Sequence, residues 1–463
     1  MLPTFIKFNA DSRSDSSNKL QSDDVAIEKG PGASVSIVEE TRTVVSDESA
    51  SVVSSISDLE VTNAFKVHSW DKKSGYSDYI QSGLNWLNKG QEQVVMLFES
   101  PSSSNQESMF YNSQVYKFHD YPPSSNAYRT TLGPCRYSSM NGSAFPSYLE
   151  AGDAPAGLVE HWEATIPGFQ RPTFVAEIPD SAKIFAYLPC ESIKNHVNDP
   201  SVHYHLVGKD ALHLMTKRTT KMLPNTRDVR PCVVKTTHSM ASKGIFIIRN
   251  DEDEAEFEQF MAESGNPTYV ITEYVEIERN AACHFFIHPN GEVTFFGCNE
   301  NRRDENGNFT LDSYLIVKDQ THLREIQLPF VKDVAQYCHS LGFWGFCGAD
   351  VLFDPSGQGY LVDVNPRVTG SCPSLMVLQL LKEKYDFDFG LFRRHGNITY
   401  YGTAAQLFDE VERHNTEHLG ESMIVLFGVH EDGPEDTKMN IGVYGHSLES
   451  CQTILNAIAR PSR

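Results

Sequence analysis

The feature that most constrains this chain is a pair of apolar runs around a cluster of turn-forming residues. The runs occupy residues 345–353 and 360–367, and Asp-Pro-Ser-Gly-Gln-Gly at 354–359 separates them. This pattern predicts a β-hairpin. With the turn centred between Ser356 and Gly357, the opposed pairs are Phe353 with Tyr360, Asp350 with Asp363, and Gly348 with Asn365.

The acidic residues of this hairpin predict a metal site. Because side chains alternate along a strand, Asp350, Asp363 and Asn365 share one face. Opposed Cβ atoms lie roughly 4.5–5.5 Å apart, so the two carboxylates repel each other unless they share a proton or a cation. Oxygen ligands suit Mg²⁺, which is usually held by one or two carboxylates together with substrate phosphates.

The alternative is a solvated hairpin whose acids are incidental, and it predicts polar residues across the exposed face. Instead, apolar residues surround the acids: Val351, Leu352, Phe353, Leu361, Val362 and Val364. A nucleotide-bound metal site is therefore the better interpretation.

Composition excludes several classes of function. The 463 residues carry a formal net charge of −22, which argues against a surface for nucleic acid or for an anionic membrane. No run approaches the roughly 18 apolar residues of a membrane span, and the N-terminus has no signal-peptide apolar core. Nine scattered cysteines indicate free thiols in a reducing compartment, with the cytoplasm as the default.

The chain divides into four predicted segments. Residues 1–62 form a Ser-rich acidic leader, which we expect to be disordered because it has little apolar surface to bury. Residues 63–200 form a small α/β domain, in which the pattern leaves 101–160 unassigned. Residues 201–400 hold the main domain, and 401–463 form an α/β extension.

Two lysines upstream of the hairpin have the setting of phosphate ligands. Lys209 lies in a predicted helix over residues 203–215, and Lys235 lies near the end of a predicted strand over 230–237. A lysine that follows a buried strand is costly unless an anion meets it. A small, hydroxyl-rich linker, His238–Gly244, then precedes a second strand, and its backbone amides could approach phosphate oxygens. An ordinary hairpin turn remains the alternative for this linker.

Further elements follow the same periodic patterns. We expect strands over 94–99, 173–176, 183–188, 269–276, 284–287, 293–298, 423–428 and 439–444, and helices over 82–87, 251–264, 329–341, 374–381 and from Ser447. Asn301–Asn308 is expected to be a polar loop.

The parts follow one another in the order Lys209, Lys235, Glu273-Tyr274-Val275-Glu276, Asp350 and Asp363-Val364-Asn365-Pro366-Arg367. Over residues 200–400 this order resembles the ATP-grasp superfamily of carboxylate–amine ligases. Within it the chain is similar to L-amino-acid ligases, D-alanine–D-alanine ligases and the ATP-grasp domain of carbamoyl-phosphate synthase. The resemblance implies an α/β ATP-grasp fold, in which two α+β subdomains grip ATP behind a small N-terminal α/β domain.

The resemblance also implies roles for individual residues. Lys209 and Lys235 would contact the α- and β-phosphates, and the loop with Ser242 and Gly244 would cover the β- and γ-phosphates. Glu273 and the backbone at Val275 would meet adenine. Asp350, Asp363 and Asn365 would hold two Mg²⁺, or Mn²⁺ in their place. Arg367 would approach the transferred phosphoryl group with help from Arg302 or Arg303, and Thr369 and Ser371 would contact a substrate carboxylate.

Three residues depart from the family pattern. Asp363 stands where many members have Glu, the phosphate loop has one glycine, and Arg279 occupies the place of the ribose-binding acid, for which Glu278 is the nearest substitute.

The resemblance implies ATP-dependent ligation of a small-molecule carboxylate to an amine through an acyl phosphate, with release of ADP and phosphate. It also implies that a substrate is an amino acid. A kinase-like phosphotransferase and a non-catalytic ATP-binding regulator remain alternatives. The sequence does not identify either substrate, and a homodimer is left open.

Overall fold

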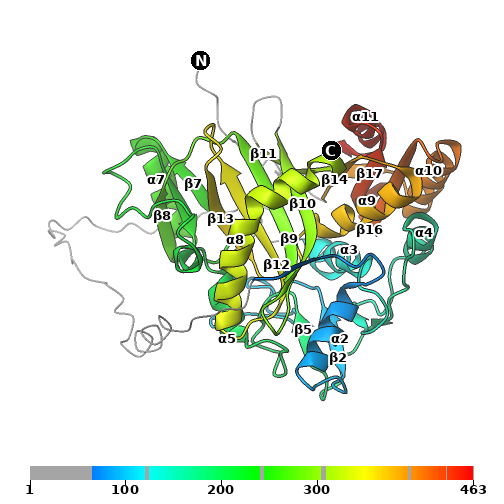
Figure 1. Cartoon of the computed structure of the whole chain (residues 1–463), viewed down its shortest axis with the longest axis horizontal. Coiled ribbons are helices and arrows are strands. Elements are labelled where there is room, and N and C mark those ends of the chain that lie inside the picture. Colours follow the sequence, from blue (N-terminus) through cyan, green and yellow to red (C-terminus); the bar gives the residue numbers. More distant parts are fainter. Residues whose placement is uncertain are drawn as a thin grey trace, which may run out of the picture. The chain divides into compact units, whose positions relative to one another are not determined.

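The residues that the structure describes form three β-sheets with helices packed against them (Figure 1). The computed structural model describes residues 65–119, 125–239, 244–303, 309–394, 398–433 and 435–461. The predicted leader 1–62 lies outside these residues, as does Ser242. The mixed α/β class predicted from the sequence is confirmed.

The largest sheet has eleven strands and contains the predicted hairpin. Its order is β13 (Gly359–Asn365), β12 (Gly345–Phe353), β9 (Arg279–Ile287), β10 (Val293–Arg303), β11 (Phe309–Ile316), β14 (Phe389–Arg393), β17 (Asp436–Gly445), β15 (Ile398–Tyr401) and β18 (Arg460–Pro461). Strand β1 (Val67–Ser69) pairs in parallel with β10, and β16 (Ser422–Glu431) pairs with β17. Because β12 lies between β13 and β9, the hairpin is anchored inside the sheet.

Two smaller sheets complete the strand inventory of the described residues. One is parallel, in the order β4 (Phe174–Val175), β3 (Ser147–Tyr148), β2 (Val94–Leu97) and β5 (Lys183–Ala186). All four residues of β2 are buried, as expected for a parallel strand covered on both faces. The other is antiparallel, in the order β7 (Ile245–Ile248), β6 (Cys232–Thr236) and β8 (Tyr269–Glu273).

The helices lie between and beside these sheets. They are α2 (Tyr76–Trp86), α3 (Gly133–Ser138), α4 (Leu158–Thr165), α5 (Pro200–Val207), α6 (Leu212–Met215), α7 (Asp251–Glu263), α8 (Gln320–Ser340), α9 (Cys372–Tyr385), α10 (Ala404–Glu417) and α11 (Leu448–Ile458). A π-helical turn, Tyr128–Leu132, precedes α3, and 3₁₀ turns span Lys209–Ala211 and Val317–Asp319. Asn250 and Ser447 cap the N-termini of α7 and α11, since each side chain accepts from the backbone N–H three residues ahead.

The hairpin register agrees with the prediction at the acids and differs near the turn. Asp350 pairs with Asp363 and Gly348 with Asn365, but Phe353 pairs with Gly359 rather than with Tyr360. The register shifts after Asp350 because Val362 has no partner across the ladder, which is the geometry of a β-bulge.

Three predicted element boundaries were wrong. The helix expected over 203–215 breaks at Gly208, because the backbone N–H of Lys209 bonds the carbonyl of Thr237 at 3.0 Å instead of continuing the helix. Helix α8 begins nine positions before Pro329, which sits inside it, so this proline costs the helix one hydrogen bond without ending it. Strand β10 continues through Arg303, where a loop was expected.

No helix in the described ranges is long and apolar enough to cross a membrane. All nine cysteines are buried free thiols, in agreement with the absence of disulfides expected from their spacing.

Most of helix α9 is buried, and it packs against β10 and β14 of the large sheet. Leu375 is 0% exposed, and a Cβ built at Gly297 of β10 would lie 2.7 Å from its Cδ2, so helix and strand are in close contact here. Gly297 also has a φ of +144°, which favours glycine at this crossing.

Replacing Leu375 with alanine should therefore lower the free energy of unfolding by about 2–5 kcal/mol, since it removes buried methyl groups and leaves a cavity. Leu419→Ala is the matched control, because Leu419 is 63% exposed, and it should change stability by less than about 0.5 kcal/mol. Chemical denaturation of both variants measures this. If both variants unfolded with the same free energy, the packing of α9 against the large sheet would not contribute to stability as we expect.

Candidate active site

The two opposed carboxylates of the hairpin form the centre of the site. Asn365 Nδ2 donates to Asp363 Oδ2 at 3.1 Å and lies 3.5 Å from Asp350 Oδ2, so one amide spans both acids. The ammonium of Lys209 forms an ion pair with Asp363 and is only 8% exposed. The structure thus brings together the three predicted metal ligands and one predicted phosphate lysine.

Asp350 shows the cost of placing two acids together. Burial and the neighbouring charge of Asp363 raise the pKa of Asp350 to about 7, although the charges of Lys209, Arg394 and Arg367 act in the opposite direction. A cation between the two carboxylates would favour the ionised form of both.

Lys235, the second predicted phosphate lysine, lies near the end of β6 and faces the hairpin. Its Nζ donates to the carbonyl of Val362 at 3.3 Å. Val362 is the residue that the bulge leaves without a partner across the strand pair. Burial lowers the pKa of Lys235 to about 8, while Asp363 raises it and Lys209 lowers it further. Lys209 and Lys235 together line a small cleft, whose other walls are Leu212, His213, Thr219, Thr220, Met222, Val270 and Thr272.

The segment after α6 joins the small antiparallel sheet to the hairpin across this cleft. The backbone N–H of Leu361 donates to the carbonyl of Arg218 at 2.7 Å, and the N–H of Leu223 donates to Ile271 at 2.9 Å. The carboxylate of Glu273 accepts from the backbone N–H of Lys221 at 2.8 Å. Glu273, predicted to meet adenine, therefore already holds this connecting segment with one oxygen.

The remaining predicted nucleotide residues lie at the end of β8 and beyond it. Val275 is half-buried and Glu278 is exposed. Arg279, in the expected place of a ribose-binding acid, is paired with Glu300 at 2.9 Å. Their predicted roles stay predictions.

Gly244 closes the predicted phosphate loop in a conformation that needs glycine. Its φ is +70°, and a Cβ there would lie 2.1 Å from Thr236 Oγ1. Residues 240–243, including Ser242, and the side chains of Arg302 and Arg303 lie outside the described residues.

Arg367 is held beside the acids by two groups. Its Nη2 donates to Asn365 Oδ1 at 2.6 Å and its Nη1 to the hydroxyl of Tyr187 at 2.5 Å, with the guanidinium 4.7 Å from the centre of that ring. Its Nε is buried and has no hydrogen-bond partner. The sequence indicated Arg367 but not Tyr187, which comes from the distant segment after β5.

A buried polar network supports the loop that follows the hairpin. Thr369 Oγ1 and His284 Nδ1 lie 2.5 Å apart, His284 Nε2 and Asn299 Oδ1 lie 2.6 Å apart, and Ser371 Oγ donates to Asn299 Oδ1 at 2.8 Å. The hydroxyls of Thr369 and Ser371, expected to contact substrate, are thus engaged in positioning this loop. His284 and Asn299 were not indicated by the sequence, because their pairing is visible only across β9 and β10.

The donor set fits a hard cation that also binds phosphate. The described residues contain no group of three or more His, Cys, Asp and Glu that could hold a metal alone. The carboxylates of Asp350 and Asp363 instead match the one or two carboxylates that Mg²⁺ typically takes in nucleotide sites. The amide oxygen of Asn365 accepts from Arg367 in this structure, so Asn365 would have to turn its carboxamide to become a third ligand.

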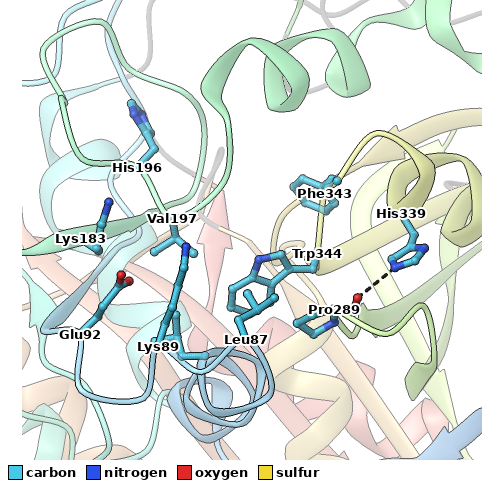
Figure 2. Close-up of a pocket in the computed structure, with 12 residues that line it drawn as sticks. Leu87, Lys89, Glu92, Lys183, His196, Val197, Pro289, His339, Phe343 and Trp344 are labelled. Atoms are coloured by element: carbon cyan, nitrogen blue, oxygen red, sulfur yellow. Dashed lines mark hydrogen bonds between the residues drawn. The ribbon is translucent and has the colours of Figure 1, made fainter. Parts of the chain in front are cut away.

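A cavity of about 340 Å³ lies away from the hairpin (Figure 2). Figure 2 shows Leu87, Phe343 and Trp344 on its apolar side, with Lys89, Glu92 and Lys183 on its polar side. His339 lies within hydrogen-bond distance of the carbonyl of Pro289, at 3.0 Å. None of the predicted site residues lines this cavity.

Comparison with known proteins identifies the segment around the site. Residues 214–365 match a family described as L-aspartate–L-methionine ligase, ATP grasp. No curated protein matches the sequence.

Among solved structures, the chain is similar to three ligases or synthetases. N5-carboxyaminoimidazole synthetase from Staphylococcus aureus, complexed with ADP, is 13% identical, with 79% of this chain and 96% of that one covered at a TM-score of 0.46. L-amino acid ligase from Bacillus licheniformis is 12% identical, with 80% and 98% covered at 0.44. N5-carboxyaminoimidazole ribonucleotide synthetase from Thermotoga maritima is 13% identical, with 81% and 100% covered at 0.44.

We expect Asp363→Asn to abolish turnover while leaving the fold intact, because the change removes a charge but hardly any volume. Asp354→Asn is the matched control on the same hairpin: Asp354 accepts from the backbone at Ser356 and Gln358 through an oxygen that asparagine retains. Mg²⁺-dependent ADP release measures activity, and circular dichroism checks the fold. Full activity of Asp363→Asn would overturn the metal assignment.

Lys235→Met should mainly weaken ATP binding, by about 1.5–3 kcal/mol, because it removes a cation placed for a phosphate rather than a reacting group. Lys217→Met, at an exposed position outside the cleft, is the control. Calorimetric titration with ATP and Mg²⁺ measures the difference, and equal affinities of the two variants would contradict this role.

Proposed function

Residues 214–365 carry the ATP-grasp fold of carboxylate–amine ligases, and we propose that the chain uses ATP to join the carboxylate of one amino acid to the amine of another. The observation that carries the proposal is the ion pair between Asp363 of the acidic hairpin and Lys209, which lines a cleft together with Lys235. L-Aspartate and L-methionine, which name the matching family, are the first substrates to test.

The proposed reaction has two steps. A carboxylate oxygen attacks the γ-phosphorus of ATP, the bond to the β-phosphate oxygen breaks, and ADP and an acyl phosphate form. The amine nitrogen then attacks the acyl carbon, the bond to the phosphate oxygen breaks, and phosphate leaves as the nitrogen loses a proton. The products are an amide, ADP and inorganic phosphate.

The residues of the cleft serve both steps mainly through position and charge. We assign Lys209 and Lys235 to the phosphates and Arg367 to the transferred group, where Asn365 and Tyr187 fix its guanidinium. Cations that neutralise the transferred group are the main catalytic requirement of phosphoryl transfer. Mg²⁺ held by Asp350, Asp363 and Asn365 would supply further charge neutralisation there.

The proposed location is a reducing compartment, the cytoplasm. Nine buried free thiols support this proposal, since disulfides form and persist mainly in oxidising compartments.

Hydroxylamine trapping separates this function from its alternatives. With ATP, Mg²⁺ and L-aspartate, hydroxylamine should intercept the acyl phosphate as a hydroxamate. With L-methionine in place of hydroxylamine, the reaction should release ADP and phosphate together. Arg367→Ala should lower trapping, because it removes the guanidinium beside the transferred group. Arg171→Ala, which removes an exposed guanidinium paired with Glu160 and Glu163, is the control and should trap normally.

A screen of amino acids, singly and in pairs, extends the assay if this first pair is inactive. A kinase would give ADP with the phosphate retained on a stable product and no hydroxamate, and a silent binder would give neither. AMP and pyrophosphate as products would overturn the proposed mechanism.

A further inference from the structure

Arg136 of α3 is a buried cation that forms no ion pair with any residue that the structure describes. Its side chain is 1% exposed, and its acceptors are the hydroxyls of Tyr137 at 2.8 Å and Tyr128 at 3.4 Å and the amide oxygen of Asn440 at 3.5 Å. Its Nε has no hydrogen-bond partner. All three acceptors are neutral, so the described residues leave this charge uncompensated.

A chain of hydroxyls connects Arg136 to the metal hairpin. The hydroxyls of Tyr137 and Tyr187 are 3.0 Å apart, Tyr187 accepts from Arg367 at 2.5 Å, and Arg367 donates to Asn365 at 2.6 Å. Two tyrosine hydroxyls therefore link the two guanidiniums.

Arg394 brings a third guanidinium to the same place. It crosses the loop after the hairpin at Gly370, where a Cβ would lie 2.9 Å from its Cδ, so the loop leaves room for this side chain. The charge of Arg394 lowers the pKa of both Asp350 and Tyr128. Among the described residues, no carboxylate forms an ion pair with Arg136, Arg367 or Arg394.

Tyr128 is the point on which the three guanidiniums act together. It is half-buried on the π-helical turn before α3, a conformation that is frequent at functional sites. Burial raises the pKa of its hydroxyl, but the charges of Arg136, Arg394 and Arg367 outweigh burial and lower it below its usual range. The surroundings of this hydroxyl thus favour negative charge.

Guanidiniums buried without a counter-ion are costly, and a bound anion removes that cost. We propose that Tyr128, Arg136 and Arg394 form a subsite for a carboxylate of an amino-acid substrate. The carboxylate bound there is one that is not converted to the acyl phosphate. The planar fork of a guanidinium matches a carboxylate, and the tyrosine hydroxyl adds a donor. This inference rests on the proposed function and extends it: the subsite makes the enzyme select for a free carboxylate in addition to the one that reacts.

The free carboxylate has two sources, the side chain of the acid substrate or the α-carboxylate of the amine substrate. The experiment compares kcat/KM for L-aspartate with L-methionine against two neutralised pairs, in which L-asparagine replaces L-aspartate or L-methioninamide replaces L-methionine. If the amino-acid screen identifies another pair, its free acids and amides are used in the same way. The neutralised substrate that lowers kcat/KM of the wild type most identifies which substrate supplies the free carboxylate.

Arg394→Gln should reduce the preference for the free acid over its amide by about ten- to a hundredfold, and Tyr128→Phe should reduce it less, because the second change leaves the charges in place. Arg413→Gln, an equal charge change on the exposed face of α10, is the control and should keep the wild-type preference. Thermal melting confirms that each variant is folded. If Arg394→Gln does not fold, Tyr128→Phe carries the test.

The inference is overturned if both site variants keep the wild-type acid-to-amide preference while ADP release continues, a result that leaves the proposed ligase intact. It is also overturned if Arg394→Gln weakens calorimetric ATP binding and leaves the preference unchanged, since the guanidinium would then serve a phosphate. No ADP release from the wild type with any amino acid would instead contradict the proposed function itself.

Discussion

The repulsion between Asp350 and Asp363 is the constraint on which the site depends. Strand pairing holds the two carboxylates face to face, and β12 cannot move away from β13 without also leaving β9. Burial and the charge of Asp363 raise the pKa of Asp350, and the amide of Asn365 and the ammonium of Lys209 offset only part of both effects. The fold therefore holds a pair of acids whose ionised forms a bound cation would stabilise, and Lys209 already neutralises one of them.

The positive groups around the hairpin fall into two sets. Lys209 and Lys235 line the cleft beside the small antiparallel sheet, whereas Arg367, Arg394 and Arg136 approach from the segments after β13, β14 and the π-helical turn. The chain as a whole has a net charge of −22, so this concentration of cations is local. A ligase that handles a nucleotide and a carboxylic acid together needs two such sets, because each anion must be neutralised in its own position.

Local patterns predicted the parts of the site that depend on neighbouring residues in the chain. Alternation along the hairpin placed Asp350 opposite Asp363, and turn chemistry placed the bend. The bulge at Val362 could not be predicted, because no glycine marks it and its carbonyl meets Lys235 only in the folded chain. The break at Gly208 likewise depends on a tertiary hydrogen bond to Thr237. Arg136 and Tyr187 come from parts of the chain where the pattern assigned at most a strand, and they meet Arg367 only through tertiary packing.

The burial of all nine cysteines has a consequence for how this protein meets oxidants. Burial raises the pKa of Cys135, Cys372 and Cys451 to about 12, so almost no thiolate forms at neutral pH in the folded chain. Because the thiolate is the species that reacts, electrophiles and peroxides are met by inert side chains as long as the core stays closed. The reactivity of these thiols toward oxidants is thus governed by how often the core opens, and not by the redox surroundings alone.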